Sequence, residues 1–307
     1  LFNSFYFQPA NALSQGAGTI LSPGWFDALT WIEQNTAPCA VVATYWDPGH
    51  FITAIAQRAV VFDGASQGAQ RTVPTSMDDG THIQHHDKEI NRIIQVRDGN
   101  ATTARINDIA ITLFTDNETL AVDILKNYMK PACGELYYIA SNDLVGKSTW
   151  WTYFSTWHPN GVENPCSSTL NKGKCFNYVQ ASLLRATPVP RENAISYTYP
   201  LGGSNSFIIF ESDTGIRAFL QQGNTFVRVS NVFYVDKAGT PRVIQEPEAE
   251  INGLLWVDPS KQLIIFMPPE LMNSVFTRLY FFNGAGLENF EFINNWGGEV
   301  KLYRVKL

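Results

Sequence analysis

The apolar and polar positions follow two patterns along the chain. Over 1–195, helical periodicity alternates with short apolar runs typical of buried strands. This predicts helices over 22–35, 50–58, 117–129 and 142–157, and strands over 39–45, 59–62 and 135–140. From about residue 197 onward, period-two alternation recurs between Gly-, Asn- and Pro-containing turns, with one helical stretch at 269–280. We therefore predict an α+β fold with a mixed α/β core domain over 1–195 and a β-rich domain over 196–307.

The helix over 22–35 has the clearest local signals. Ser22 is a good N-cap and Pro23 fits the first helical position. Trp25, Leu29 and Ile32 then recur with the spacing of one buried helix face. Residues 64–81 are instead rich in Gly, Ser, Thr, Gln and Asp, which predicts an exposed loop.

Composition narrows the class of protein. The 22 Lys and Arg against 28 Asp and Glu give a net charge of −6, which argues against a nucleic-acid binder with a broad basic face. Abundant apolar and aromatic residues exclude an intrinsically disordered chain. The longest apolar runs, such as 263–267, are far shorter than the ~20 residues of a membrane helix. The start at Leu1, with no Met and no signal-peptide pattern, predicts a piece of a longer protein.

The 4 cysteines allow a prediction about disulfides. Cys166 and Cys175 flank a polar loop, and we predict that they form a disulfide, which implies an oxidising compartment or a thermophile. Cys39 and Cys133 lie beside apolar segments and are expected to be small buried residues or free thiols. The sequons at Asn100 and Asn117 are too common by chance to decide anything.

Two segments carry weak signals for chemistry. Ser66 lies in a G-x-S-x-G pattern, the nucleophile elbow of serine hydrolases, but no helical apolar pattern follows it. A flexible loop is therefore the favoured interpretation. His82, His85 and His86 could bind a metal if residues 82 and 85 shared a helical face, although a solvated helix start explains this polar segment as well.

The segment 45–50 is more informative. Tyr45, Trp46 and Asp47 follow a predicted buried strand and precede a predicted helix, where loops commonly carry function. The alternative is a purely structural turn, in which Asp47 caps the next helix and Trp46 packs on the core. Spacing alone does not decide between the two.

The sequence here resembles a known family. Residues 44–52, Thr-Tyr-Trp-Asp-Pro-Gly-His-Phe-Ile, are similar to the W-W-D-Y-G signature of the oligosaccharyltransferase catalytic subunits Stt3, AglB and PglB, with archaeal AglB closest. The segments 31–36, 141–148 and 273–281 agree with this resemblance. The resemblance covers most of the chain, but only as the C-terminal part of that family, which implies a multi-spanning membrane region before Leu1.

The resemblance implies a role for the motif residues. In the family, this element grips the hydroxyl of Ser or Thr in the acceptor sequon Asn-x-Ser/Thr. Here the carried-over residues are Trp46 and Asp47, with Tyr45 in the place of the first Trp. The chemistry is coherent, because an indole N–H only donates and a carboxylate only accepts, while a hydroxyl satisfies both.

A second element of the family completes the Ser/Thr pocket with a Lys on a helix. Asp143 and Lys147 resemble this pair, with Trp151 four residues further on, although their spacing is one residue longer than usual. The i, i+4 spacing predicts that the three side chains share one helix face. An exposed Asp–Lys pair without function is the alternative.

The resemblance therefore implies the extracytoplasmic domain of an oligosaccharyltransferase, which transfers an oligosaccharide from dolichol phosphate to the Asn of a sequon. The expected partners are the acceptor polypeptide and, through the membrane region, the lipid-linked oligosaccharide, with no nucleic acid. Mn²⁺ or Mg²⁺ would be held by the membrane region, so we expect no metal ligand or catalytic residue in this chain, and no activity from it alone. The alternatives are a serine hydrolase using Ser66 and a non-catalytic carbohydrate- or protein-binding module.

Overall fold

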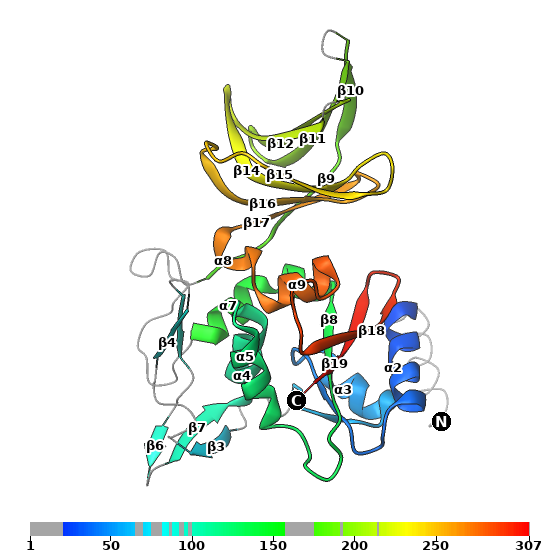
Figure 1. Cartoon of the computed structure of the whole chain (residues 1–307), viewed down its shortest axis with the longest axis vertical. Coiled ribbons are helices and arrows are strands. Elements are labelled where there is room, and N and C mark those ends of the chain that lie inside the picture. Colours follow the sequence, from blue (N-terminus) through cyan, green and yellow to red (C-terminus); the bar gives the residue numbers. More distant parts are fainter. Residues whose placement is uncertain are drawn as a thin grey trace, which may run out of the picture.

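A computed structural model describes residues 21–64, 70–74, 82–85, 88–91, 95–97, 100–156, 175–190, 193–213 and 215–306. These residues form two modules, one above the other in Figure 1. The lower module is built on a five-stranded sheet covered by helices, and the upper one on a nine-stranded sheet. The architecture is α+β, as the sequence predicts.

The five-stranded sheet has the order β18-β19-β8-β1-β2, in which β1, β2 and β8 are parallel and β19 is antiparallel to β8. Its strands are β1 (Val41–Ala43), β2 (Ala59–Val60), β8 (Leu136–Ser141), β18 (Phe290–Trp296) and β19 (Val300–Val305). Its helices are α2 (Pro23–Asn35), α3 (Gly49–Phe51), the π-helix η2 (Ile52–Ala56), α4 (Arg105–Phe114), α5 (Glu118–Lys126), α6 (Asp143–Gly146), α7 (Ser148–Thr156), α8 (Pro269–Met272) and α9 (Val275–Phe282).

Both faces of this sheet are buried. In β8, Tyr138 and Ala140 face a core shared with α4, α5, α7 and α9, whereas Tyr137 and Ile139 face a second core shared with α2 and η2. This alternation follows from the two-residue period of a strand. A sheet buried on both sides reads as a continuous apolar run, which explains why the strand pattern at 135–140 is so clear.

Local signals in the sequence place the helices well. Ser22 caps α2 by accepting a hydrogen bond from the Trp25 backbone N–H at 3.3 Å. The buried Arg58 guanidinium donates to the carbonyls of Glu33 and Thr36 where α2 ends. Helix α4 was not predicted from the sequence, and nearly all of its residues are buried, including the polar Asn107, Asp108 and Thr112.

The nine-stranded sheet forms the upper module. Its main path is β10-β11-β12-β13-β14-β16-β17-β9, and β15 pairs with β14. Neighbouring strands are antiparallel except for the parallel pair β14 and β16. The strands are β9 (Val179–Ser182), β10 (Arg185–Val189), β11 (Ala194–Gly202), β12 (Asn205–Ser212), β13 (Gly215–Gln222), β14 (Thr225–Val235), β15 (Pro241–Gln245), β16 (Ile251–Val257) and β17 (Leu263–Met267).

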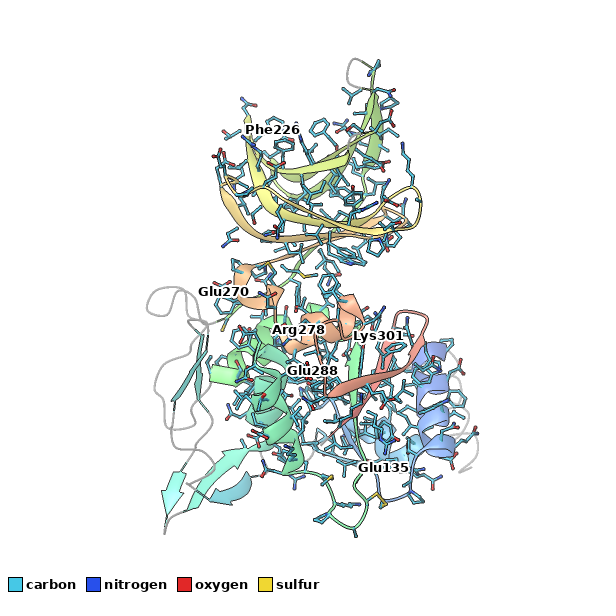
Figure 2. The ribbon with its side chains drawn as sticks, in the orientation of Figure 1. Glu135, Phe226, Glu270, Arg278, Glu288 and Lys301 are labelled. Atoms are coloured by element: carbon cyan, nitrogen blue, oxygen red, sulfur yellow. A yellow bond between two sulfur atoms is a disulfide. The ribbon has the colours of Figure 1, made fainter. Side chains whose placement is uncertain are left out.

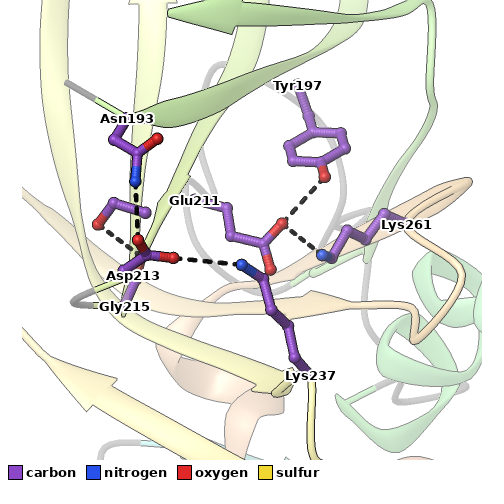
Figure 3. A network of polar contacts seen from close by, with 8 residues as sticks. Asn193, Tyr197, Glu211, Asp213, Gly215, Lys237 and Lys261 are labelled. Carbon is purple, nitrogen blue, oxygen red and sulfur yellow. Dashed lines mark hydrogen bonds and ion pairs between the residues drawn. The ribbon is translucent and has the colours of Figure 1, made fainter. Parts of the chain in front are cut away.

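A charged network is enclosed in the upper module (Figure 3). Glu211 of β12 is only 8% exposed and accepts from the Tyr197 hydroxyl at 2.9 Å and the Lys261 ammonium at 2.5 Å. Lys261 belongs to the turn between β16 and β17, where the Tyr199 hydroxyl donates to its carbonyl. The network therefore ties this turn to strands β11 and β12.

The two modules do not separate at residue 196. Strands β9 and β10 precede that position but belong to the nine-stranded sheet, and β18 and β19 follow it but belong to the five-stranded sheet. Without β19, strand β8 would be an open edge of the five-stranded sheet. The chain returns to this sheet, where β19 pairs with β8 over Val300–Arg304. Period-two alternation identifies strands but not the sheet that they join.

The cysteines pair differently from the prediction. Cys39 and Cys133 form a disulfide with a Cα–Cα distance of 5.8 Å, so the prediction of buried residues or free thiols was wrong. The bond joins the segments that lead into the neighbouring strands β1 and β8, and Cys133 lies two residues before Glu135, which Figure 2 labels. Cys175 is also disulfide-bonded. Cys166 lies outside the described residues, so the predicted Cys166–Cys175 pair stays a prediction.

Three-strand and two-strand sheets make up the described parts of 70–104. They contain β3 (Gln70–Pro74), β4 (His82–His85), β5 (Lys88–Asn91), β6 (Gln95–Arg97) and β7 (Asn100–Ala104). His82 and His85 therefore lie on a strand rather than a helix, and His86 and Ser66 lie outside the described residues. The segment Gln70–Pro74 after Ser66 is a strand, not a helix.

Candidate functional site

The candidate site lies where two parallel strands end. Strand β1 leads into Tyr45–Asp47, and its neighbour β8 leads into Asp143 and Lys147. In open sheets with parallel strands, ligands commonly bind beyond the carboxyl ends of the strands. The topology therefore brings together two sequence motifs that are about a hundred residues apart.

The turn after β1 is tightly built. The Gly49 N–H donates to the Trp46 carbonyl at 3.1 Å, and α3 begins without a side-chain cap, with Pro48 at the N-cap position. Asp47 is therefore not the helix cap that the structural alternative required. A Cβ at Gly49 would lie 2.8 Å from the Phe62 carbonyl oxygen, so only glycine fits against the segment after β2.

Lys147 joins the two motifs. Its ammonium lies 2.9 Å from Oδ2 of Asp47 and 2.7 Å from Oδ2 of Asp143. The Ser141 hydroxyl donates to Oδ1 of Asp143 at 2.5 Å, which fixes this carboxylate at the end of β8. The lysine predicted from the sequence thus contacts both predicted carboxylates, despite its unusual spacing from Asp143.

The electrostatics keep this lysine charged. Partial burial acts to lower the pKa of Lys147, but the hydrogen bond and charge of Asp143, followed by those of Asp47, outweigh it and raise the pKa above its usual value. Burial raises the pKa of Tyr45, and the nearby charge of Asp47 adds to the effect while a hydrogen bond with Trp46 opposes it. The site at neutral pH therefore holds an ammonium and a neutral phenol.

Asp47 has hydrogen-bonding capacity that the described residues do not fill. Its Oδ2 atom is buried and lies 2.9 Å from the Lys147 ammonium, and the side chain as a whole is about a third exposed. A carboxylate has about four lone-pair positions, and a buried one is costly to leave unpaired. The exposed part of the Asp47 carboxylate therefore has lone pairs that can accept from a donor in the pocket.

A pocket of about 400 Å³ opens beside Asp47. Asp47 and Lys147 supply its polar wall, and four aromatic side chains line the rest: Tyr45, Trp46, Trp150 and Phe154. Trp150 is 61% exposed, and Phe154 packs against the core at the base of α7. A small polar end on a mostly apolar cavity is typical of a binding site.

One predicted site residue lies elsewhere. Trp151 is fully buried, its indole N–H donates to the Leu144 carbonyl at 2.9 Å, and its ring packs against Phe114 and Phe276. The predicted common face of Asp143, Lys147 and Trp151 does not form, because the chain leaves helical geometry at Lys147 between α6 and α7. Trp150 occupies the pocket instead.

Tyr45 is also more structural than its motif position suggests. It is 2% exposed and packs edge-on against Phe62, so only part of its ring reaches the pocket. Three further residues of the site were not predicted from the sequence: Ser141, which contacts Asp143, and Trp150 and Phe154, which line the pocket. The i, i+4 spacing of two aromatic residues directly after Lys147 was the available signal for the last two.

The described residues contain neither a cluster of metal ligands nor a membrane-spanning helix. Among the described residues, no three His, Cys, Asp or Glu side chains converge as a metal site. Within the same part of the chain, no helix is long and apolar enough to cross a membrane.

Known proteins similar to this chain were found by sequence and by structure. No protein-family model matches it. A dolichyl-phosphooligosaccharide-protein glycotransferase of Methanocaldococcus jannaschii is 21% identical over 305 residues, covering 88% of this chain and 32% of the relative. One from Methanococcus voltae is 24% identical over 326 aligned positions, covering 86% and 34%. The chain thus spans about a third of the length of these relatives.

Two solved structures show the same fold. The C-terminal domain of PglB from C. jejuni matches with a TM-score of 0.50 at 11% identity, covering 92% of this chain and 99% of that one. The C-terminal globular domain of an oligosaccharyltransferase from Pyrococcus abyssi matches with a TM-score of 0.50 at 15% identity, covering 92% and 50%. Together, the curated relatives and the shared fold confirm the resemblance of this chain to the C-terminal part of archaeal oligosaccharyltransferases.

Proposed function

We propose that this chain recognises the Ser or Thr hydroxyl of an Asn-x-Ser/Thr acceptor within an oligosaccharyltransferase. The observation that carries this proposal is the placement of Asp47, which is about a third exposed, lines an open pocket and has the Lys147 ammonium 2.9 Å from its Oδ2 atom. The similarity of the chain to glycotransferases supports the choice of ligand.

A hydroxyl group matches the chemistry of this site. Lys147 has three N–H donors, and its contacts with Asp47 and Asp143 leave capacity for a further acceptor. A hydroxyl can donate to Asp47 while it accepts from Lys147 or from the Trp46 indole N–H. A residue without a hydroxyl would leave these groups unpaired, so the site would discriminate strongly against it.

The whole enzyme would transfer an oligosaccharide from dolichol phosphate to the side-chain nitrogen of the sequon Asn. Its partners would be the acceptor polypeptide and the lipid-linked oligosaccharide, on the extracytoplasmic face of the membrane. This chain would supply acceptor recognition, and the rest of the protein would supply the reacting groups. We expect the isolated chain to give no glycopeptide when mixed with donor lipid, Mn²⁺ and a sequon peptide.

The residues of this site do not fit Mn²⁺ or Mg²⁺. Asp47 and Asp143 are the only carboxylates at the described Lys147 centre, and the ammonium already lies between them, where a metal ion would have to sit. We therefore assign the family's metal to the remainder of the protein and derive no step through it here.

The alternatives have less support. A serine hydrolase would need a helix directly after Ser66, and Gln70–Pro74 is a strand. A non-catalytic binding module would retain the pocket, and it is distinguished by the sequence that precedes Leu1, because only an oligosaccharyltransferase needs a multi-spanning region there.

The decisive experiment is kinetic, in the full-length protein. Asp47→Ala should lower kcat/KM for an Asn-x-Thr peptide by roughly ten- to hundredfold, since a hydrogen bond to a charged group is worth ~1.5–3 kcal/mol. The variant should also lose part of its preference for Asn-x-Thr over the poor acceptor Asn-x-Ala.

The matched control is Asp123→Ala, at a surface ion pair on α5, which should change neither quantity. Equal losses on both peptides in Asp47→Ala, with the Thr-over-Ala ratio unchanged, would show that Asp47 is structural and would refute the proposal.

A further inference from the structure

The pocket is larger than a hydroxyl residue requires. It encloses about 400 Å³. The hydroxyl and methyl groups of a threonine fill roughly 60 Å³, at about 30 Å³ for each water-sized group. Most of the pocket therefore remains after the hydroxyl has reached Asp47 and Lys147.

The remaining space is aromatic. Trp150 and Phe154 are four residues apart on α7 and line the same pocket as Lys147, so their rings form an aromatic wall on one face of that helix. Phe154 is held in place, because the Asn107 side-chain amide of α4 donates to its carbonyl at 2.6 Å. Trp150 is 61% exposed, an unusual position for so large an apolar ring.

The length of this wall corresponds to a short stretch of peptide. Phe154 lies seven residues beyond Lys147, which along a helix is roughly 10 Å. An extended peptide advances about 3.3 Å per residue, so one or two residues beyond the hydroxyl residue fall within the wall. The residues on the other side of the hydroxyl lead to the reacting Asn, which must reach the catalytic groups outside this chain.

We infer that Trp150 and Phe154 form a subsite for a large apolar side chain of the acceptor, one or two positions after the sequon Ser or Thr. The inference rests on the proposed function and adds a second specificity determinant to it. Leu, Ile or Phe at one of these positions would cover the two rings and exclude water, whereas Gly, Ser or Lys would not. A fully buried apolar side chain of this size corresponds to about tenfold or more in affinity.

The test uses the full-length protein and peptides of the form Asn-Ala-Thr followed by two varied positions. Each position carries Leu or Ser in turn, and kcat/KM is measured for every peptide. The wild type should prefer Leu over Ser about tenfold at one of the two positions. Trp150→Ala should reduce this ratio to about 1, and Trp150→Phe should restore part of it. Because Trp150 is exposed, its replacement removes little packing within the fold.

A matched control and a second peptide pair make the result specific. Phe26→Ala removes another exposed aromatic side chain, 53% exposed on α2, and should leave the Leu-over-Ser ratio unchanged. Trp150→Ala should keep the preference for Asn-Ala-Thr over Asn-Ala-Ala, which depends on Asp47.

The inference is overturned if the wild type shows no Leu preference at either position, or if Trp150→Ala keeps that preference in full. Either result leaves the role of Asp47 standing. Failure of the proposed function would give a different result: the Thr-over-Ala ratio would stay unchanged in Asp47→Ala.

Discussion

Each module contains a carboxylate paired with a lysine, and the two pairs differ in one respect. Glu211 in the upper module is 8% exposed and has both a tyrosine hydroxyl and a lysine as partners, so its network is closed (Figure 3). Asp47 in the lower module is about a third exposed and lines an open pocket, with the Lys147 ammonium 2.9 Å from its Oδ2 atom. The comparison teaches that exposure to a pocket, more than the pairing of the charges itself, separates a structural ion pair from one that can meet a ligand.

The largest expected effect lies in the closed network. Glu211→Ala should lower the free energy of unfolding by about 3–5 kcal/mol, because it leaves the Lys261 ammonium largely buried without its partner. Asp47→Ala should change it by no more than about 1 kcal/mol, since both partners of that ion pair are about a third exposed. Urea unfolding of the two variants of this chain measures both values. Similar losses in both variants would break the comparison.

A third lysine sharpens the comparison, because Lys301 has no carboxylate partner among the described residues. Its ammonium donates to the Tyr280 carbonyl and to Asn283 where α9 ends, and Figure 2 shows it beside that helix. Burial lowers the pKa of Lys301 to about 8, from an ordinary value of 10.5. Between these values the unfolded chain binds more protons than the folded one, so this residue's contribution to stability rises with pH.

Between pH 7.5 and pH 10, the free energy of unfolding of the wild type should therefore rise by about 2–3 kcal/mol relative to that of Lys301→Met. This rise is most of what the full pKa shift corresponds to. Urea unfolding of both proteins at several pH values gives this difference, and the other titrating groups cancel in it. A difference that stays constant over this range would show that Lys301 keeps an ordinary pKa.

The smallest expected effect concerns Lys147. In the full-length protein, Lys147→Ala should reduce kcat/KM for an Asn-x-Thr peptide by about tenfold, the worth of one hydrogen bond from a charged donor. Lys126→Ala, at an exposed ion pair on α5, is the matched control. Unchanged activity in Lys147→Ala would mean that the lysine only neutralises Asp47 and Asp143.

The sequence allowed the motif residues to be predicted, but not the shape of the pocket. Asp47 and Lys147 were predicted because their segments resemble two motifs of a known family, whereas local spacing alone left their roles open. Trp150 was missed and Trp151 was chosen in its place, because the break between α6 and α7 at Lys147 changes which face of the helix is inward. Such a break depends on tertiary packing, here the burial of the Trp151 indole against α4 and α9.

The fold shows the same limit. The strand pattern at 300–305 was visible, but its pairing with β8 was not, because side-chain alternation carries no information about the partner strand. Likewise, four cysteines permit several pairings, and only the adjacency of β1 and β8 explains why Cys39 and Cys133 meet.

The disulfide between Cys39 and Cys133 sets an order of events in time. The two cysteines are 94 residues apart, and a ribosome adds about 5–20 residues per second. Cys39 therefore waits as a free thiol for roughly 5–20 seconds before its partner has been synthesised. During this interval β1 already carries Tyr45, Trp46 and Asp47, but β8 and its lysine do not yet exist. The cross-link can close as soon as Cys133 has been synthesised, just before β8, so it can hold the two segments together while the second half of the site follows.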